Sequence, residues 1–541
     1  MPKPSEISAL DVIGPNMIGP SSSHTAGALR IALLASQMMN GQVKSAKFLL
    51  YGSFARTYQG HGTDRALVAG ILGMRADDER IRDSFEIAKE RGIDINFDFD
   101  FENETVHPNT VDLILRGDTS FVTIRGESVG GGRAVIRRIN GVDIEFTGSY
   151  NTILIHHIDR PGVVARLTNV LAEHKINIAF MRLYREQKGK RAYMILETDE
   201  VLPVAVSEQL NQLESVQQAI IIPTLDAAAN SSGKVTDQKE LEGIDTDLLD
   251  FHNMKELTKA VQETVLSIGE LMIRREMHLF SRSKEECMAL MGRAWSIMKA
   301  SVRDALDAPR KSIGGLIGGE AKILKQQIDQ KEKSGNAPLS GSLISRASTY
   351  AMGVLEVNAS MGLIVAAPTA GAAGIVPGTL IALAELYDYD DEAMVVALYN
   401  AAAIGMLIAA HGSVSGAEGG CQAETGSAAA MAASAVTALQ GGTIHEQLSS
   451  ASTCLQNVLG LVCDPIGGLV EAPCQRRNAL GVANAILAAE MSLAGLSNIV
   501  PLDEMILVTM QVGQNLPTSL RETGLGGTAI APSACAACGL C

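Results

Sequence analysis

The sequence predicts a multidomain protein with an α+β N-terminal domain, a βαββαβ module of the ferredoxin-like type and an all-α C-terminal domain. The chain has 541 residues, which at about 150 residues per domain is long enough for several separate cores. Short apolar runs alternate with helical stretches before residue 226, whereas helical periodicity dominates after residue 247. No lysine follows Lys333, so the last part of the chain is apolar enough for helices buried on all sides.

We assign residues 1–149 to the α+β domain because apolar runs such as KFLLYG and FVTIRG, typical of strands, alternate with helical stretches. The glycine-rich turn at residues 129–132 lies between two of its extended segments.

Residues 150–225 show one complete βαββαβ pattern. The run TILIHHI predicts the first strand, and the turn at residues 159–162 precedes the helix VVARLTNVLAEH. Two strands follow, INIAFMRLYRE and RAYMILET, and then a helix at residues 204–213 and the strand QQAIIIP. Residues 226–247 are polar and predict a linker, and residues 248–541 make up the helical domain.

Composition excludes several functions. The formal net charge of −15 provides no basic field for nucleic acid or anionic lipid, so we expect neither as a partner. The N-terminal residues lack the pattern of a secretory signal, which predicts a cytoplasmic location. The uncharged stretch at residues 393–410 is long enough to span a bilayer, but it is alanine-rich and contains Asn400, so we expect a buried helix.

The eight cysteines are crowded toward the C-terminus, because only Cys287 precedes position 400. Cys421, Cys463 and Cys474 each lie near Gly or Pro, where the backbone can approach a metal centre closely. Each alone is equally typical of a small buried apolar residue, but together they suggest a shared metal site, with zinc as one alternative. The tail adds a C-x-x-C-x-x-C pattern at Cys535, Cys538 and Cys541. This spacing is partly that of the cluster-binding cysteines of small ferredoxins, and the alternative interpretation is a solvent-exposed end of the chain.

Two polar turns near the N-terminus can serve a substrate. Residues 19–27, GPSSSHTAG, place hydroxyl and N–H groups at a helix start, which suits a carboxylate or phosphate but also ordinary helix capping. Residues 60–64, GHGTD, place His61 between glycines, where it could carry a proton or be only structural. Because the glycine-rich half offers no lysine for a Schiff base, we do not expect pyridoxal phosphate.

These motifs together resemble the iron–sulfur-dependent L-serine dehydratase family, also called L-serine ammonia-lyase. The resemblance rests on GPSSSHT at residues 19–25, GHGTD at 60–64, PTAGAAGIVPG at 368–378 and the Gly-Cys loop at Cys421. It covers most of the chain and indicates the fused form, with the β part before the α part. The module at residues 152–223 is similar to an ACT domain, with its D-x-P-G turn at 159–162 and its I-N-I strand at 176–178.

The resemblance implies that Cys421, Cys463 and Cys474 hold three irons of a [4Fe–4S] cluster whose fourth iron is open. It also implies that Cys541 occupies that iron until substrate displaces it, whereas Cys535 and Cys538 match no family feature. We hypothesise that the Cys541 thiolate, or His61 working with it, removes the α-proton of L-serine, and that the open iron acts as a Lewis acid on the hydroxyl group. The expected substrate-binding residues are Ser21, Ser22, Ser23, His24, Thr25, Thr63 and Asp64. The expected products are pyruvate and ammonia.

The resemblance further implies a homodimer and an amino-acid ligand at the ACT domain. Two alternatives stay open at this point. One is a lyase of the same family that prefers L-threonine or L-cysteine, because a methyl group or a sulfur changes the fit of a pocket only modestly. The other is a non-catalytic amino-acid or redox sensor, which would bind ligand without making pyruvate. A simple electron carrier needs neither polar turn and is disfavoured.

Overall fold

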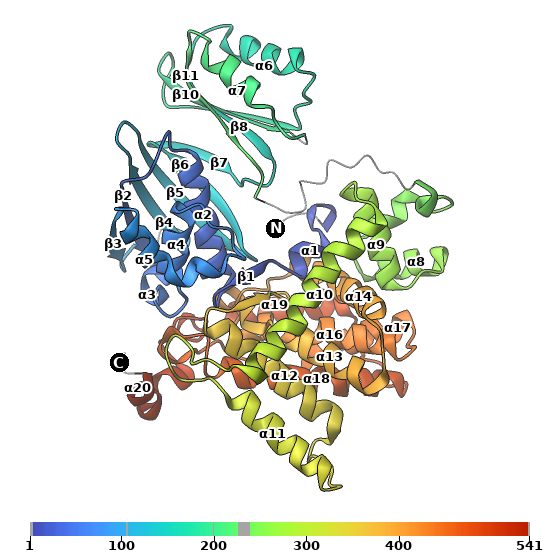
Figure 1. Ribbon diagram of the computed structural model, residues 1–541. Coiled ribbons are helices and arrows are strands. Elements are labelled where there is room, and N and C mark those ends of the chain that lie inside the picture. The colour runs from blue at the N-terminus through green and yellow to red at the C-terminus, as the bar shows by residue number, and fades with distance from the viewer. Residues whose placement is uncertain (1–3, 104–105, 199, 226–237, 539–541) are drawn as a thin grey trace.

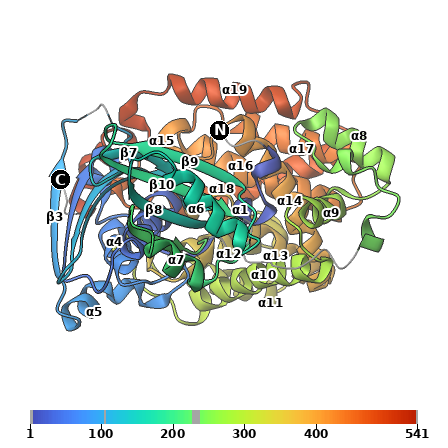
Figure 2. The ribbon, with the colours of Figure 1, turned by 90° about the horizontal axis from the view of Figure 1, so that it is seen from above.

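The computed structural model describes residues 4–103, 106–198, 200–225 and 238–538 (Figure 1). Residues 226–237 of the predicted linker, and Cys541, lie outside the described residues. The multidomain fold class is confirmed: a mixed α/β part, a βαββαβ module and a helical part follow one another along the chain. Figure 2 shows the N-terminal sheet at one side of the molecule and the helical part at the other, with the module in front of them near the middle.

The N-terminal part is built on a six-stranded sheet in the order β3-β2-β4-β5-β6-β7, in which only the β2–β3 pair is parallel. Its strands are β2 (Ser45–Tyr51), β3 (Asp94–Asp100), β4 (Thr110–Arg116), β5 (Phe121–Gly130), β6 (Arg133–Ile139) and β7 (Val142–Phe146). Alternate residues of β2, namely Ala46, Phe48 and Leu50, are buried in the core, as the two-residue period of a strand requires.

Helices α2 (Gly27–Gln37) and α4 (Thr63–Ile71) pack together over this sheet, with the shorter helices α3 (Gly52–Thr57) and α5 (Ser84–Glu90) beside them. The two long helices approach closely at Gly70, where a Cβ atom would lie 2.5 Å from the backbone oxygen of Leu29. Their close packing brings the two polar turns that begin them to the same end of the domain.

The module forms a four-stranded antiparallel sheet in the order β11-β8-β10-β9. Its elements are β8 (Asn151–Ile158), α6 (Val163–Glu173), β9 (Phe180–Arg185), β10 (Arg191–Thr198), α7 (Val204–Asn211) and β11 (Val216–Ile222). The predicted order is therefore confirmed, but the expected strand at residues 176–178 is wrong. Strand β9 begins only at Phe180, opposite Glu197, and β10 ends at Thr198, so among the described residues none pairs with residues 176–178 as a strand.

The two faces of this sheet have different neighbours. Ile153, Ile155 and Met194 point toward α6 and α7 and form a core of the module's own. Tyr193 and Ile195 point the other way and belong to the core of the N-terminal part, where the Asn140 side-chain amide donates to Tyr193 Oη at 3.1 Å. The module is therefore packed onto the N-terminal sheet through its helix-free face.

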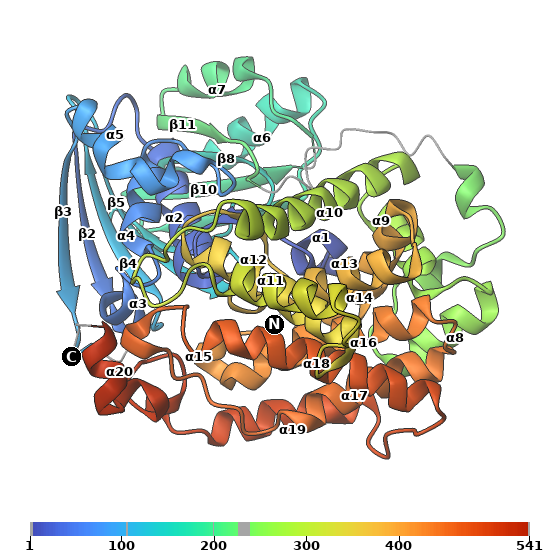
Figure 3. The same cartoon turned by 60° about the horizontal axis from the view of Figure 1, so that its bottom comes forward.

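The helical part contains long helices that surround the apolar helices α13 and α14 (Figure 3). Its helices are α8 (Met254–Thr264), α9 (Ile268–Leu279), α10 (Lys284–Asp307), α11 (Glu320–Lys333), α12 (Gly341–Ala359), α13 (Ile375–Tyr387), α14 (Asp391–His411), α15 (Gly416–Gly419), α16 (Ser427–Leu439), α17 (Ile444–Asn457), α18 (Cys474–Leu493), α19 (Leu502–Asn515) and α20 (Pro532–Cys538). Two segments, Ala370–Tyr387 and Asp391–His411, are long and apolar enough to cross a membrane. In the second, which contains the uncharged stretch, 83% of the apolar window is buried, as expected of a core helix.

The N-terminal segment ties the two halves together. Strand β1 (Asn16–Ile18) pairs with β12 (Leu363–Val365) of the helical part, and α1 (Ala9–Val12) is buried beside α14. The hydroxyl of Ser8 and the N–H of Ala9 both donate to the Glu276 carboxylate, which is fully buried with its partner Arg282. Because β1 ends directly before the GPSSSHT turn, this pairing fixes the turn against the helical part.

Candidate active site

The GPSSSHT turn forms a π-helical turn at Ser22–Ala26 that continues into α2. Ser21 caps it, since its Oγ accepts the N–H of His24 at 3.1 Å. Two outside contacts hold the turn: Thr25 Oγ1 donates to the backbone oxygen of His61 at 2.7 Å, and Ser128 Oγ on β5 donates to that of Ser23 at 2.6 Å. The turn is therefore both a helix start, as the capping interpretation expects, and a rigid wall for a ligand.

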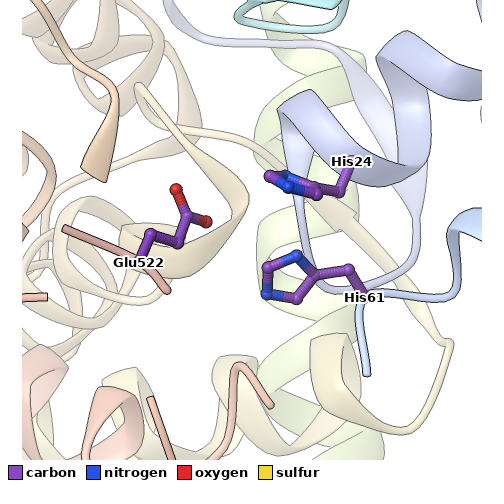
Figure 4. A group of neighbouring side chains, drawn as sticks. All are labelled: His24, His61 and Glu522. Carbon is purple, nitrogen blue, oxygen red and sulfur yellow. The ribbon is translucent and has the colours of Figure 1, made fainter. Parts of the chain in front are cut away.

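His24 and His61 face each other, with ring centroids 4.4 Å apart (Figure 4). His24 contacts the hydroxyl groups of Ser23 and Ser53 through its two ring nitrogens, each at 2.9 Å. His61 is fully buried, and neither of its ring nitrogens has a hydrogen-bond partner among the described residues. Burial lowers the pKa of His61 to about 4 and that of His24 well below its ordinary value, so both rings are neutral near pH 7 and His61 can accept a proton.

Thr63 and Asp64, the other residues of the GHGTD turn, begin α4. The Asp64 carboxylate accepts the backbone N–H of Arg65 at 2.8 Å, and burial raises its pKa to about 6. Neither residue lines the pocket described next. Their role in binding substrate stays a prediction.

One pocket brings together segments from both ends of the chain. Its wall includes Ser21, Ser22 and Ser23 from the first turn and Cys463 and Cys474 from the helical part. Gly130, the last residue of β5, and Gly131, which follows it, complete one side of the wall. A ligand in this pocket therefore contacts the hydroxyl-bearing turn and the cysteine loops at the same time.

Cys421, Cys463 and Cys474 are free thiols on three separate segments. Cys421 lies directly before the π-helical turn Gln422–Gly426, and Cys463 forms an isolated β-bridge with Arg521. Cys474 is the first residue of α18. Burial, then the charges of Glu424 and Glu522, and last those of the other two thiols raise the pKa of Cys463, so all three sulfurs lie within electrostatic range of one another. Such buried thiols are stable as thiolates only beside a cationic centre.

The residues present fit an iron–sulfur cluster. Cys421 and Cys463 have glycines close by in the sequence and Cys474 follows Pro473, and the side chains around Gly416 leave no room for a larger residue there. A Cβ atom on Gly416 would lie 3.1 Å from Cys463 Sγ. By contrast, Cys287 and Cys454 are buried elsewhere in the helical core, and Cys535 and Cys538 lie on α20 with their thiols bonded to backbone oxygens.

Two carboxyl groups on the pocket wall were not singled out from the sequence. Burial raises the pKa of Glu424 to about 7, and burial with the charge of Glu424 raises that of Glu522 to about 8. Glu424 follows Cys421 within the Gly-Cys loop, so that motif could have indicated it. Glu522 has no local signal, because it reaches the site only through the backbone pairing of its segment with Cys463.

Backbone contacts hold the C-terminal segment beside Cys463. The N–H of Cys463 donates to Leu520 O at 2.9 Å, and the N–H of Glu522 donates to Cys463 O at 2.8 Å. The Asp464 carboxylate then accepts Arg477 Nη2 at 2.7 Å and the backbone N–H of Thr528 at 2.6 Å. These contacts place Glu522 opposite the two histidines: the ligand atoms of His24, His61 and Glu522 all lie within 4.8 Å of one another, close enough to share a metal ion (Figure 4).

His24 and His61 do not line the pocket themselves, but they lie within 4.8 Å of Glu522, which does. Buried thiols on a pocket wall, with a helix start opposite and neutral histidines close by, are typical of a metal-dependent enzyme. Comparison with known proteins narrows this class. Family models match as "Serine dehydratase beta chain" over residues 12–138, "ACT domain" over 151–215 and "Serine dehydratase alpha chain" over 263–529. The chain belongs to the L-serine dehydratase family, in its fused single-chain form, as the sequence motifs predicted.

Relatives match both the parts and the whole. A "Probable L-serine dehydratase, alpha chain" of Bacillus subtilis is 45% identical over 52% of this chain and 92% of its own length. The L-serine dehydratase of Streptomyces coelicolor is 30% identical over 95% of this chain and 96% of its own. L-serine dehydratase TdcG of Escherichia coli is 29% identical over 97% and 99%.

Proposed function

We propose that this chain is an L-serine ammonia-lyase that converts L-serine to pyruvate and ammonia. One observation carries the proposal: Ser21, Ser22 and Ser23 line the same pocket as Cys463 and Cys474, although they lie at opposite ends of the sequence. This pocket joins groups that suit an α-carboxylate to thiols that suit a metal centre. The names of the full-length relatives support the same substrate.

In this proposal Cys421, Cys463 and Cys474 hold a [4Fe–4S] cluster. When bound, the cluster supplies an open iron as Lewis acid for the β-hydroxyl, which is otherwise a poor leaving group. The glycine loops around the cysteines allow the close approach that such a cluster needs.

The first turn binds the substrate carboxylate. Ser22 and Ser23 present their N–H groups at the start of the π-helical turn, where backbone dipoles favour an anion. The contacts of Thr25 with His61 and of Ser23 with Ser128 keep this turn in place without further ordering when substrate binds.

The Cys541 thiolate, or a ring nitrogen of His61 working with it, takes the α-proton. Burial keeps the His61 ring neutral near pH 7, and its unpartnered nitrogens leave it free to accept a proton. Loss of the α-proton and of the β-hydroxyl as water gives aminoacrylate. Aminoacrylate then tautomerises to an imine, and water hydrolyses the imine to pyruvate and ammonia.

The test is anaerobic reconstitution with iron and sulfide, followed by iron analysis, visible absorption and pyruvate assay with L-serine, L-threonine and L-cysteine. Cys463→Ala should lose iron and turnover. Cys454→Ala is the matched control, because Cys454 is also buried but lies in the helical core, and should keep both. Fastest turnover of L-threonine or L-cysteine would reassign the substrate, whereas a bound cluster without any turnover would favour the sensor.

We also propose that the module binds an amino acid, that the chain forms a homodimer and that it acts in the cytoplasm without pyridoxal phosphate. The ACT match supports the first proposal. Equilibrium dialysis tests amino-acid binding, sedimentation equilibrium tests the homodimer, and cell fractionation tests the location. Turnover that is unchanged after borohydride treatment is the result expected without pyridoxal phosphate.

A further inference from the structure

The charge of the pocket wall restricts what it can bind. Glu424 and Glu522 both line the pocket, and within the part of the chain that the structure describes no lysine or arginine lines it. Arg477 lies near the thiols, but its guanidinium donates to Val462 O and Asp464 Oδ1, at 2.8 and 2.7 Å. The pocket therefore has two carboxyl groups, which a bound cation would hold ionised, and no free cation to balance a ligand that is only anionic.

Glu522 is held rigidly at this wall. It is 6% exposed, and its N–H donates to the backbone oxygen of Cys463. Its carboxylate lies with the imidazoles of His24 and His61 in a group whose ligand atoms are all within 4.8 Å of one another. His24 already uses both ring nitrogens in contacts with serine hydroxyls, whereas the nitrogens of His61 have no partner among the described residues. The Glu522 carboxylate accepts one backbone N–H, from Ala417, which leaves most of its acceptor capacity unused, and the unpartnered nitrogens of His61 lie beside it.

An α-ammonium group is a donor that suits the remaining acceptor capacity of Glu522 and His61. It carries one positive charge and three N–H groups, and a charge-assisted hydrogen bond to a carboxylate is about twice as strong as a neutral one. We propose that Glu522 binds the α-ammonium group of the substrate and thereby selects α-amino acids over α-hydroxy acids. Because the ammonium nitrogen is bonded to the α-carbon, this contact also brings the α-proton next to His61.

The inference rests on the proposed function, because that function sets the orientation of the substrate. The binding test of the inference does not need turnover. L-Alanine and L-lactate differ only in carrying an ammonium or a hydroxyl group on the α-carbon, and neither has a β-hydroxyl to eliminate. Their inhibition constants against L-serine are measured with the anaerobic holoenzyme, and their binding to the same samples is measured by titration calorimetry. The wild type should bind L-alanine more tightly than L-lactate.

Glu522→Gln should lower this preference by about 10- to 100-fold, the range expected when one charged hydrogen bond is lost. Glu522→Asp, which keeps the charge, should restore most of it. Glu418→Gln is the matched control, because Glu418 lies on the exposed surface near the same loop and its carboxylate accepts a bond from Ser413. It should leave the preference unchanged.

An equal preference in the wild type and Glu522→Gln overturns the inference, and so does an equal loss in the Gln and Asp variants. A lower kcat with an unchanged preference also overturns it, since Glu522 then acts only in proton transfer or in folding. If the chain makes no pyruvate but calorimetry shows Glu522-dependent binding of L-alanine, the inference stands and the proposed function fails. If the chain makes pyruvate but Glu522→Gln leaves the preference for L-alanine over L-lactate unaltered, the proposed function stands and the inference fails.

Discussion

Gly416→Ala tests how tightly the cysteine side of the pocket is packed. A Cβ atom at this position would lie 2.8 Å from Glu424 Oε2 and 3.1 Å from Cys463 Sγ. Ordinary contacts between heavy atoms are about 3.5–4 Å, so both neighbours must move by roughly half an ångström. Cys463 has little room to do so, because its N–H and C=O are both bonded to the C-terminal segment.

Overpacking of this kind costs about 1–3 kcal/mol. If the strain falls on the thiolates that hold the cluster, it weakens iron retention by roughly 5- to 150-fold, since about 1.4 kcal/mol corresponds to a factor of ten. The assay is iron per chain and visible absorption after anaerobic reconstitution and a timed challenge with a chelator. The rate of pyruvate formation should fall in parallel with iron content.

Gly292→Ala is the control for a glycine-to-alanine change in the same helical part. Gly292 lies inside α10, and a Cβ atom there would meet nothing within 4 Å. Alanine should stabilise that helix by about 0.5–1 kcal/mol and leave iron content unchanged. If Gly416→Ala held its iron as firmly as Gly292→Ala, the reasoning from the pocket wall would be refuted.

Three further predictions follow from buried polar contacts. His61 has a pKa of about 4 in the folded protein against 6.5 when unfolded, so its contribution to stability is present above pH 6.5 and is lost as the pH falls toward 4. Guanidinium unfolding should show His61→Asn losing about 2 kcal/mol less than the wild type between pH 7 and pH 5, and equal losses would contradict the assignment. Ser128→Ala leaves the backbone oxygen of Ser23 without its 2.6 Å donor, at a cost of about 1–3 kcal/mol, and should raise the KM for L-serine. Ser301→Ala breaks a similar buried bond in α10, so an equal rise in KM there would show that the effect is not local. Asp464→Asn should weaken a charged contact by about 1.5–3 kcal/mol and expose the C-terminal segment to earlier cleavage in limited proteolysis; an unchanged cleavage rate would argue that Asp464 does not anchor the segment.

Hydrophobic patterning and local motifs determined much of this protein from its sequence alone. The apolar run KFLLYG, the complete βαββαβ pattern and the uncharged stretch at residues 393–410 each predicted an element that the structure contains, because a strand or helix that is buried in a core needs apolar residues at the buried positions. The serine turn and the cysteine loops could also be identified, since glycine, proline and small polar residues mark such turns locally.

The tertiary structure decided which of these motifs share a pocket and which residues complete it. The pairing of β1 with β12 brings the serine turn to the cysteines, and the backbone bonds of Cys463 bring Glu522 to His61. Neither contact has a local signal, because each depends on main-chain groups that every residue carries and on segments far apart in the chain. The shortened strand β9 has the same cause, since a strand extends only as far as its partner does.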